Sequence, residues 1–204
     1  MNSYEDAPRD GARDILLDVD GVIYPFPELF TPWLAGRLER ELELDTTCWE
    51  FYERWGLDYA EFIEHLVDAV REQALWWTGE PYPDVAATFG RWRRQGHRIH
   101  LVTARDVAGA EAGLAATRHW LASHGLEVAS VNLAQDKPQV LAELDLEPGN
   151  CVAVDDGPHH IAAWEDAGVY GVVMNRWGTY GGGHRSVPDL AGFADHLDQL
   201  RPAS

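Results

Sequence analysis

Two aspartates that follow a short apolar run carry the clearest chemical signal in this sequence. The apolar residues 15–17 lead into Asp18, Asp20 and Gly21, a pattern typical of a buried strand that ends in a turn. Because side chains alternate along a strand, we expect the carboxyls of Asp18 and Asp20 on the same side of its end. Gly21 would let the backbone turn sharply and approach a ligand closely.

Two carboxylates this close repel each other, and the repulsion can be relieved in two ways. Either one of them takes up a proton, which suits acid–base chemistry, or a cation lies between them. Mg²⁺ fits the second arrangement because it binds through one or two carboxylates together with phosphate oxygens of a substrate. The remaining alternative is an aspartate-rich turn that carries out no chemistry. The two aspartates alone do not distinguish acid–base chemistry, cation binding and a plain turn.

Polar side chains also follow the predicted strands in the middle of the chain. In an α/β sheet, ligands bind at the carboxyl ends of the strands, so we expect these groups to converge with the first pair. Carboxylates, a hydroxyl and an ammonium at one edge suit phosphoryl transfer with a carboxylate nucleophile and Mg²⁺. The groups are Thr103 after strand 98–102, Lys137 after strand 127–133, and Asp155 and Asp156 after strand 151–154.

The elements that must position these residues alternate in type along the chain. Strands that alternate with helices predict an α/β fold, a Rossmann-like parallel sheet with helices on both faces. The strands are expected over residues 14–19, 98–102, 127–133, 151–154 and 170–174, and the helices over 84–95, 108–123, 138–144, 158–167 and 189–200.

A smaller unit is predicted between the first two strands. Asp18 and Thr103 are 85 residues apart, whereas a strand–helix–strand crossover needs about 30, which leaves about 50 residues over. We therefore expect a core of residues 1–24 and 81–204 and a small helical cap of residues 25–80, inserted after the first strand. Cap helices are expected over 33–44, beyond the prolines between residues 25 and 32, and from a capping box at Asp58 to about Leu75.

Composition limits the possible partners and location. The net charge of −18 argues against nucleic-acid polymers and anionic membranes as partners. The chain has no apolar run near the ~20 residues of a membrane span, and its first residues lack a signal-peptide pattern. Cys48 and Cys151 form no disulfide framework. We expect a cytoplasmic protein, and the sequence leaves room for an oligomer. An anionic substrate would need a divalent cation to bind to a protein of this charge.

Four motifs of the chain resemble those of the haloacid dehalogenase superfamily of phosphatases. They are Asp18-Val-Asp-Gly-Val, Leu101-Val-Thr-Ala-Arg, Asp136-Lys-Pro and Val154-Asp-Asp-Gly-Pro. The resemblance extends over nearly the whole chain. Narrower features, in residues 117–125 and 155–161, resemble the 5′(3′)-deoxyribonucleotidase family.

The resemblance implies a role for the residues at the strand ends. Asp18 resembles the nucleophile that becomes an aspartyl-phosphate. Asp20 resembles the acid that protonates the leaving oxygen and then activates water. Thr103, Ala104 and Lys137 resemble the groups that hold the phosphate, and Lys137 also screens the nucleophile.

The same resemblance implies Mg²⁺ as the cofactor. Its ligands would be Asp18, the backbone carbonyl of Asp20 and Asp155, while Asp156 would act through water or orient a ligand. A zinc site at His159 and the neighbouring histidine is disfavoured, because adjacent side chains on a helix do not face one another.

The implied reaction is hydrolysis of a small phosphorylated substrate, most specifically a nucleoside monophosphate. Phe26, Trp76 and Trp77 lie nearest the two connections of the predicted cap, where a ring could stack on a base. Arg105 could clamp the substrate or pair with a carboxylate. An acidic residue that relatives carry is absent from residues 24–27, which leaves base and sugar recognition open. The alternatives are another small phosphomonoester as the substrate, or a phosphate-binding module without turnover.

Overall fold

The computed structural model describes residues 11–44 and 51–200. The first ten and last four residues of the predicted core, and Cys48 in the predicted cap, lie outside the described residues. Its centre is a parallel sheet of six strands in the order β3-β2-β1-β4-β5-β6. The predicted α/β fold class is thereby confirmed. The strands are β1 Asp14–Leu17, β2 Arg98–Thr103, β3 Ser130–Leu133, β4 Cys151–Asp155, β5 Tyr170–Met174 and β6 Ser186–Val187.

The central strand β1 is buried on both of its faces. Ile15 and Leu17 belong to one apolar cluster and Leu16 belongs to the other, as expected from the alternation of side chains along a strand. A strand buried on both faces reads in sequence as a continuous apolar run. This is why β1 could be recognised from three consecutive aliphatic residues.

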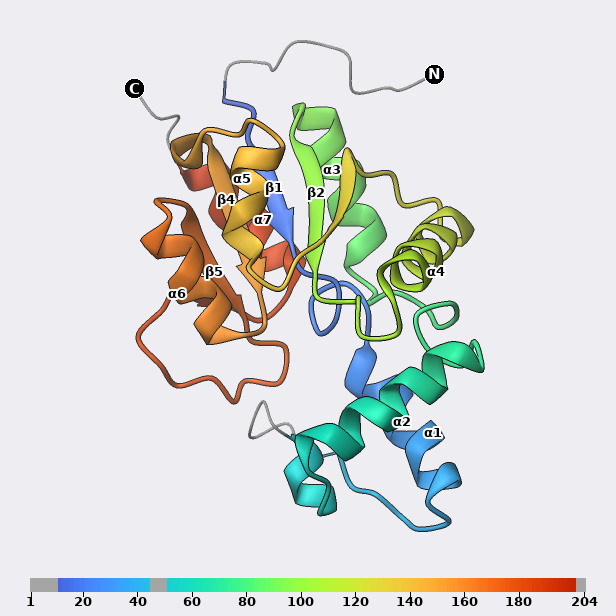
Figure 1. The fold of residues 1–204 in the computed structure, drawn as a ribbon. Helices are drawn as coiled ribbons and strands as arrows, with labels where there is room; N and C mark the ends of the chain where they lie inside the picture. The colour runs from blue at the N-terminus through green and yellow to red at the C-terminus, as the bar shows by residue number, and fades with distance from the viewer. Residues whose placement is uncertain (1–10, 45–50, 201–204) are drawn as a thin grey trace.

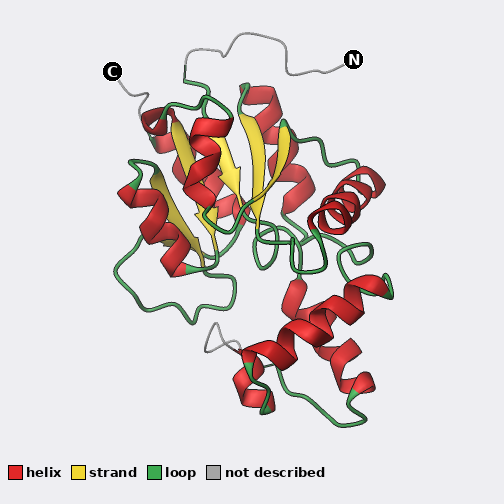
Figure 2. Cartoon of the chain, in the orientation of Figure 1, coloured by secondary structure: helices red, strands yellow, loops and turns green. Residues whose placement is uncertain are grey.

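Helices cover both faces of the sheet (Figures 1 and 2). The cluster that contains Ile15 also takes in side chains of α3, α4 and α7, and the cluster that contains Leu16 takes in those of α5 and α6. The helices are α3 Val85–Gln95, α4 Ala110–Ser123, α5 Val140–Glu143, α6 Pro158–Asp166 and α7 Leu190–Gln199, with short 3₁₀ turns at Lys137–Gln139 and Pro148–Asn150.

A group of helices without strands lies beyond the carboxyl ends of β1 and β2 (Figure 1). It consists of α1 Phe26–Arg37, a 3₁₀ turn at Phe51–Trp55 and α2 Tyr59–Arg71. Aromatic side chains form its interior, for example Tyr52 and Phe62, whose rings stack 4.6 Å apart. These residues are the segment that the sequence predicts as a cap.

The first cap helix begins earlier than the prolines predict. It covers Phe26–Arg37, not residues 33–44. Pro27 lies in the first turn, where a missing N–H removes no helix hydrogen bond. Pro32 lies inside the helix, at a local cost of about 3 kcal/mol. Full burial of Phe30 and Leu34 on the same helix contributes about 1.5–3 kcal/mol each, enough to offset a cost of that size.

The second cap helix starts as predicted and ends sooner. Asp58 caps it with Glu61 in a reciprocal capping box, but α2 stops at Arg71 rather than near Leu75. In the described part of the chain the longest helix is α4, with 14 residues. None of the described helices is both long and apolar enough to cross a membrane.

Candidate active site

Asp18 lies at the carboxyl end of the central strand. Its backbone N–H donates to Val154 O at 2.9 Å, which continues the pairing of β1 with β4 one residue beyond the strand. β1 lies between β2 and β4, at the point where the order of strands reverses. In open α/β sheets this is where ligands bind.

Gly21 allows the loop after β1 to touch the loop after β4. Its φ is +73°, and a Cβ built there would lie 2.2 Å from Asp156 Oδ2. The left-handed backbone and the close approach both require a residue without a side chain. A side chain at this position would force the Asp156 side chain or the loop backbone to shift.

Lys137 joins the nucleophile candidate to the carboxylate at the end of β4. Its Nζ lies 2.8 Å from Asp18 Oδ1 and 2.6 Å from Asp155 Oδ2, and its side chain is only 2% exposed. Burial opposes the charged form, but the charges of Asp155 and Asp18 outweigh it and raise the pKa of Lys137 above its usual value. The ammonium therefore stays charged and shields Asp18 from neighbouring negative charge.

Three carboxylates form an acidic cluster. One oxygen each from Asp18, Asp155 and Asp156 lies within 4.8 Å of the others. Burial, together with the charge of Asp18, raises the pKa of Asp155 to about 7, although Lys137 opposes the rise. Burial, together with the charges of Asp18 and Asp155, raises the pKa of Asp156 well above its usual value.

The acidic cluster has the donors that Mg²⁺ requires. Hard oxygen ligands at this spacing suit a small divalent cation. Lys137 pairs with Asp18 and Asp155, yet burial and mutual repulsion still raise the pKa of Asp155 and Asp156. A divalent cation would offset that repulsion and favour the ionised form of all three carboxyls of the cluster.

The side chain of Asp20 lies apart from the acidic cluster and binds Arg105. Arg105 Nε donates to Asp20 Oδ2 at 2.8 Å, and Arg105 Nη2 donates to Asp20 Oδ1 at 2.7 Å. Burial raises the pKa of Asp20, against the opposing charge of the guanidinium. The Asp20 side chain remains 25% exposed and lines the cavity described next.

A cavity of about 550 Å³ opens at this edge of the sheet. Asp18, Asp20, Thr103, Ala104 and Lys137 line it on the side of the sheet. Aromatic rings line it elsewhere, most of them from the cap segment. They are Phe26, Phe51, Tyr52, Tyr59, Phe62, Trp76, Trp177 and Tyr180. The cavity thus joins a charged floor to an apolar wall.

The structure divides the four residues predicted to contact the substrate. Phe26 and Trp76 line the cavity, although Trp76 is only 2% exposed. Trp77 is not among the described residues that line it, and its ring packs 5.4 Å from that of His119. Arg105, 1% exposed, is likewise outside the lining and is bound to Asp20. The geometry therefore makes Trp77 and Arg105 poor candidates for direct substrate contact.

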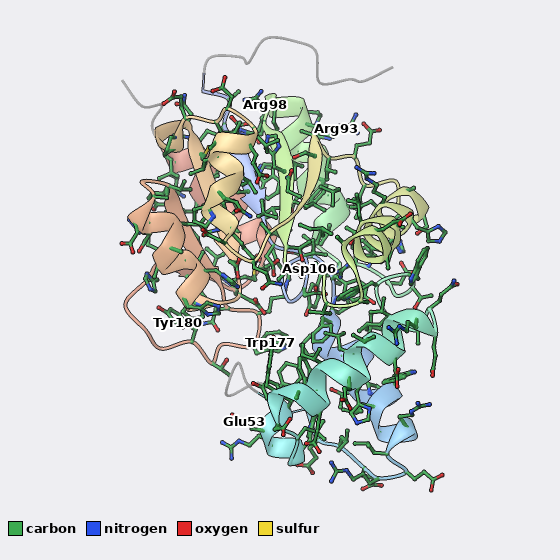
Figure 3. The ribbon with its side chains drawn as sticks, viewed as in Figure 1. Glu53, Arg93, Arg98, Asp106, Trp177 and Tyr180 are labelled. Carbon is green, nitrogen blue, oxygen red and sulfur yellow. The ribbon has the colours of Figure 1, made fainter. Side chains whose placement is uncertain are left out.

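The loop after β5 supplies further cavity residues, beyond the four predicted substrate contacts. Asn175, Trp177, Thr179 and Tyr180 line the cavity, and Figure 3 shows Trp177 on the side that faces the cap. Trp177 Nε1 donates to Glu28 Oε1 at 3.2 Å, so this loop is tied to α1. The position of this loop directly after a strand end is the feature of the sequence that could have predicted these cavity residues.

Two histidines also line the cavity. The ring centroids of His159 and His160 lie 4.0 Å apart at the start of α6, so the two side chains approach each other, contrary to the expectation from helix geometry. Burial and the nearby Lys137 lower the pKa of His160 to about 4, so this imidazole is neutral at physiological pH. Neither histidine belongs to the metal-type cluster found among the described residues.

Comparison with known proteins identifies the family of the chain. Residues 12–168 match the family described as haloacid dehalogenase-like hydrolase. No curated protein matches the chain in sequence. Three solved structures share the fold at low identity. A defluorinating L-2-haloacid dehalogenase has a TM-score of 0.64 at 14% identity, over 92% of this chain and 95% of that one.

The other two structures are a predicted phosphatase and a hydrolase. The predicted phosphatase, from Clostridium acetobutylicum, has a TM-score of 0.65 at 10% identity, over 93% of this chain and 99% of that one. The hydrolase YfnB of Bacillus subtilis, solved bound to magnesium, has a TM-score of 0.60 at 11% identity, over 92% of this chain and 99% of that one. At such identities the likeness concerns the fold.

Proposed function

Because the chain belongs to the haloacid dehalogenase-like hydrolases, we propose that it is a Mg²⁺-dependent phosphomonoesterase that forms an aspartyl-phosphate intermediate. Its substrate would be a small phosphorylated molecule, and we favour a nucleoside monophosphate. Retention of Asp18 and Asp20 argues against a binding module without turnover, since such a module has no use for a nucleophile paired with an acid.

One observation carries this proposal: Asp18 and Asp20 line the same cavity but have different partners. Asp18 pairs with Lys137 at 2.8 Å, whereas Asp20 binds Arg105 through both of its oxygens. Two carboxyls in different surroundings can take different roles, one as a nucleophile and one as an acid.

In the proposed reaction the carboxylate of Asp18 attacks phosphorus, and the bond between phosphorus and the leaving oxygen breaks. Lys137 reduces the repulsion between Asp18 and the incoming phosphate dianion. Asp20 gives its proton to the leaving oxygen. The resulting carboxylate then takes a proton from the water that hydrolyses the aspartyl-phosphate.

The acidic cluster supports Mg²⁺ as the cofactor. Asp18, Asp155 and Asp156 would hold it through their side chains, and the backbone carbonyl of Asp20 stays a predicted ligand. Mg²⁺ would supply positive charge to the phosphate oxygens. Thr103 and Ala104, which line the cavity at the end of β2, are the proposed partners of those oxygens.

Dehalogenation fits this site less well than phosphate hydrolysis. A halide leaves without a proton, so an acid such as Asp20 would have no task. A 2-haloacid is itself an anion, and the three carboxyls of the acidic cluster face one paired ammonium, that of Lys137. A phosphate, in contrast, would bind together with the divalent cation that this charge requires.

The aromatic wall supports a planar leaving group. Phe26, Tyr59 and Trp177 line the cavity without being fully buried, and Tyr59 is 61% exposed. Stacking of a base on one aromatic ring is worth about 1–3 kcal/mol. A nucleobase would occupy this wall while the phosphate lies on the charged floor. Another small phosphomonoester with an apolar group is the second candidate.

A phosphate-release screen tests the proposal. The protein would be incubated with Mg²⁺ and nucleoside monophosphates, sugar phosphates or an aryl phosphate, and in parallel with 2-haloacids and halide detection. We expect release of phosphate, fastest from nucleotides. Release of halide without phosphate would overturn the assignment, and release from sugar phosphates alone would move it to the second candidate.

The role of Asp20 predicts a dependence on the leaving group. Asp20→Asn should lower kcat for alkyl phosphates such as nucleotides by about 10²–10⁴, the usual worth of acid–base help. The loss should be smaller for an aryl phosphate, because a phenolate leaves without prior protonation. Steady-state kinetics on both esters measure the difference, and equal losses would contradict Asp20 as the acid.

The aromatic wall predicts that Trp177 contributes to specificity. Trp177→Ala should lower kcat/KM for nucleotides by about 5- to 150-fold, the worth of one stacked base, and should affect a small aryl or sugar phosphate much less. Trp77→Ala is the matched control, since the same group is removed outside the cavity lining. Thermal unfolding of both variants shows whether folding is affected. Equal effects of the two substitutions on nucleotide hydrolysis would remove Trp177 from the site.

A further inference from the structure

The contact between Arg105 and Asp20 has a geometry that a general ion pair does not need. Two different nitrogens of the guanidinium bind the two oxygens of one carboxyl, at 2.8 and 2.7 Å. Paired parallel hydrogen bonds of this kind set the plane of a carboxylate as well as its position. The Asp20 carboxyl is thus held in one orientation.

The guanidinium is itself held on its remaining sides. Arg105 Nη1 donates to Thr117 Oγ1 at 3.2 Å. Its Cζ lies 4.5 Å from the centroid of the Tyr24 ring and 5.2 Å from that of the Trp76 ring, within the range of cation–π attraction. Tyr24 and Trp76 are joined in turn, because the backbone N–H of Trp76 donates to Tyr24 Oη at 2.9 Å.

The backbone of Arg105 packs against the first turn of α4. A Cβ placed on Gly113 would lie 1.6 Å from Arg105 O, so the helix and the loop touch at a point where only glycine fits. Side chain and main chain of Arg105 are therefore both enclosed. A group intended to move onto a substrate would not be enclosed in this way.

From this geometry we infer that Arg105 is a positioning residue: it aims the carboxyl of Asp20 into the cavity and makes no contact with the substrate. The inference rests on the proposed phosphatase function, in which Asp20 transfers the proton. Each carboxyl oxygen keeps a second lone pair when it accepts one N–H, so Asp20 can carry and release a proton while Arg105 holds it.

The test compares Arg105→Lys with the unchanged protein on an alkyl and an aryl phosphate. Lysine keeps the charge but loses the two-pronged contact. We expect kcat for the alkyl ester to fall by about 10²-fold, as for a small misplacement of a catalytic group. Hydrolysis of the aryl ester and both KM values should stay close to those of the unchanged protein. A higher KM with unchanged kcat would instead make Arg105 a substrate clamp and overturn the inference.

A double-substitution cycle isolates the path through Asp20. If Arg105 acts only through Asp20, Arg105→Lys should have almost no further effect on the alkyl ester in the Asp20→Asn background. Independent, multiplying losses would overturn the inference, as would equal losses on both esters. Thr117→Val, which removes only the contact to Nη1, is a milder variant that should show the same ester preference if Arg105→Lys does not fold.

The outcomes separate this inference from the function on which it rests. An unchanged protein that hydrolyses neither ester would overturn the proposed function and this inference with it. An unchanged protein that hydrolyses both, with Arg105→Lys equally active on both, would overturn the inference alone.

Discussion

Replacement of Asp18 by asparagine is expected to lower turnover by at least about 10⁴, a loss of the size seen when a catalytic nucleophile is removed. Asparagine has nearly the same shape, but its amide oxygen does not attack phosphorus. Lys137 keeps its second carboxylate partner, Asp155, at 2.6 Å, so the floor of the cavity should persist. Single-turnover and steady-state phosphate release would both report the loss.

Binding provides the complement to that experiment. The Asp18→Asn protein should still bind inorganic phosphate in the presence of Mg²⁺, measured by calorimetry. Asp106→Asn is a suitable control, because Asp106 lies at the same end of the sheet (Figure 3) but is not among the described residues that line the cavity. Undiminished kcat in the Asp18 variant would exclude the aspartyl-phosphate route.

Removal of divalent cations is expected to abolish phosphate release, and Mg²⁺ should restore it. The physical reason is the acidic cluster, which would repel a phosphate dianion unless a cation lay between them. Activity that persists after exhaustive chelation would contradict the metal requirement.

The residue that links this effect to the acidic cluster is Asp155. Asp155→Asn removes one negative oxygen and should raise the Mg²⁺ concentration for half-maximal activity by at least about tenfold. Asp136→Asn supplies the control, since Asp136 is exposed and precedes Lys137 directly. Unchanged Mg²⁺ dependence in the Asp155 variant would locate the cation elsewhere.

A second readout of the metal site needs no turnover. Mg²⁺ that binds the folded chain should raise its thermal unfolding temperature, because a ligand at 100 times its Kd adds about 2.7 kcal/mol of stability. The rise should be smaller in Asp155→Asn than in Asp136→Asn. This measurement separates weak metal binding from a defect in the reaction itself.

The sequence alone predicted strands β1 to β5 and the charged edge of the sheet, but not the two-residue strand β6. β1 is buried on both faces and therefore appears as a short apolar run, and Asp18 follows it at once. The groups at the ends of β2 and β4 were found in the same way. Chain position suffices here because parallel strands end at a common edge, so residues far apart in sequence meet there without any knowledge of side-chain packing.

Only the tertiary structure decided where the side chains next to these groups point and what they contact. Arg105 follows the same strand as Thr103, yet its side chain turns to Asp20 and is enclosed by Tyr24 and Trp76. Trp76 and Trp77 are adjacent in sequence, but only the first lines the cavity. The direction of the Arg105 side chain depends on contacts with residues as far as 85 positions away in the sequence, which no local pattern encodes.

The start of α1 and the aromatic wall of the cavity also depend on packing between distant segments, which the sequence pattern does not encode. Local proline rules predict a later helix, and burial of Phe30 and Leu34 against distant residues overrides them. Trp177 lies in a loop without periodicity, and its contact with Glu28 joins segments almost 150 residues apart. Local patterns encode where strands end, because that depends on short apolar runs. Packing between distant segments decides which side chains meet above them.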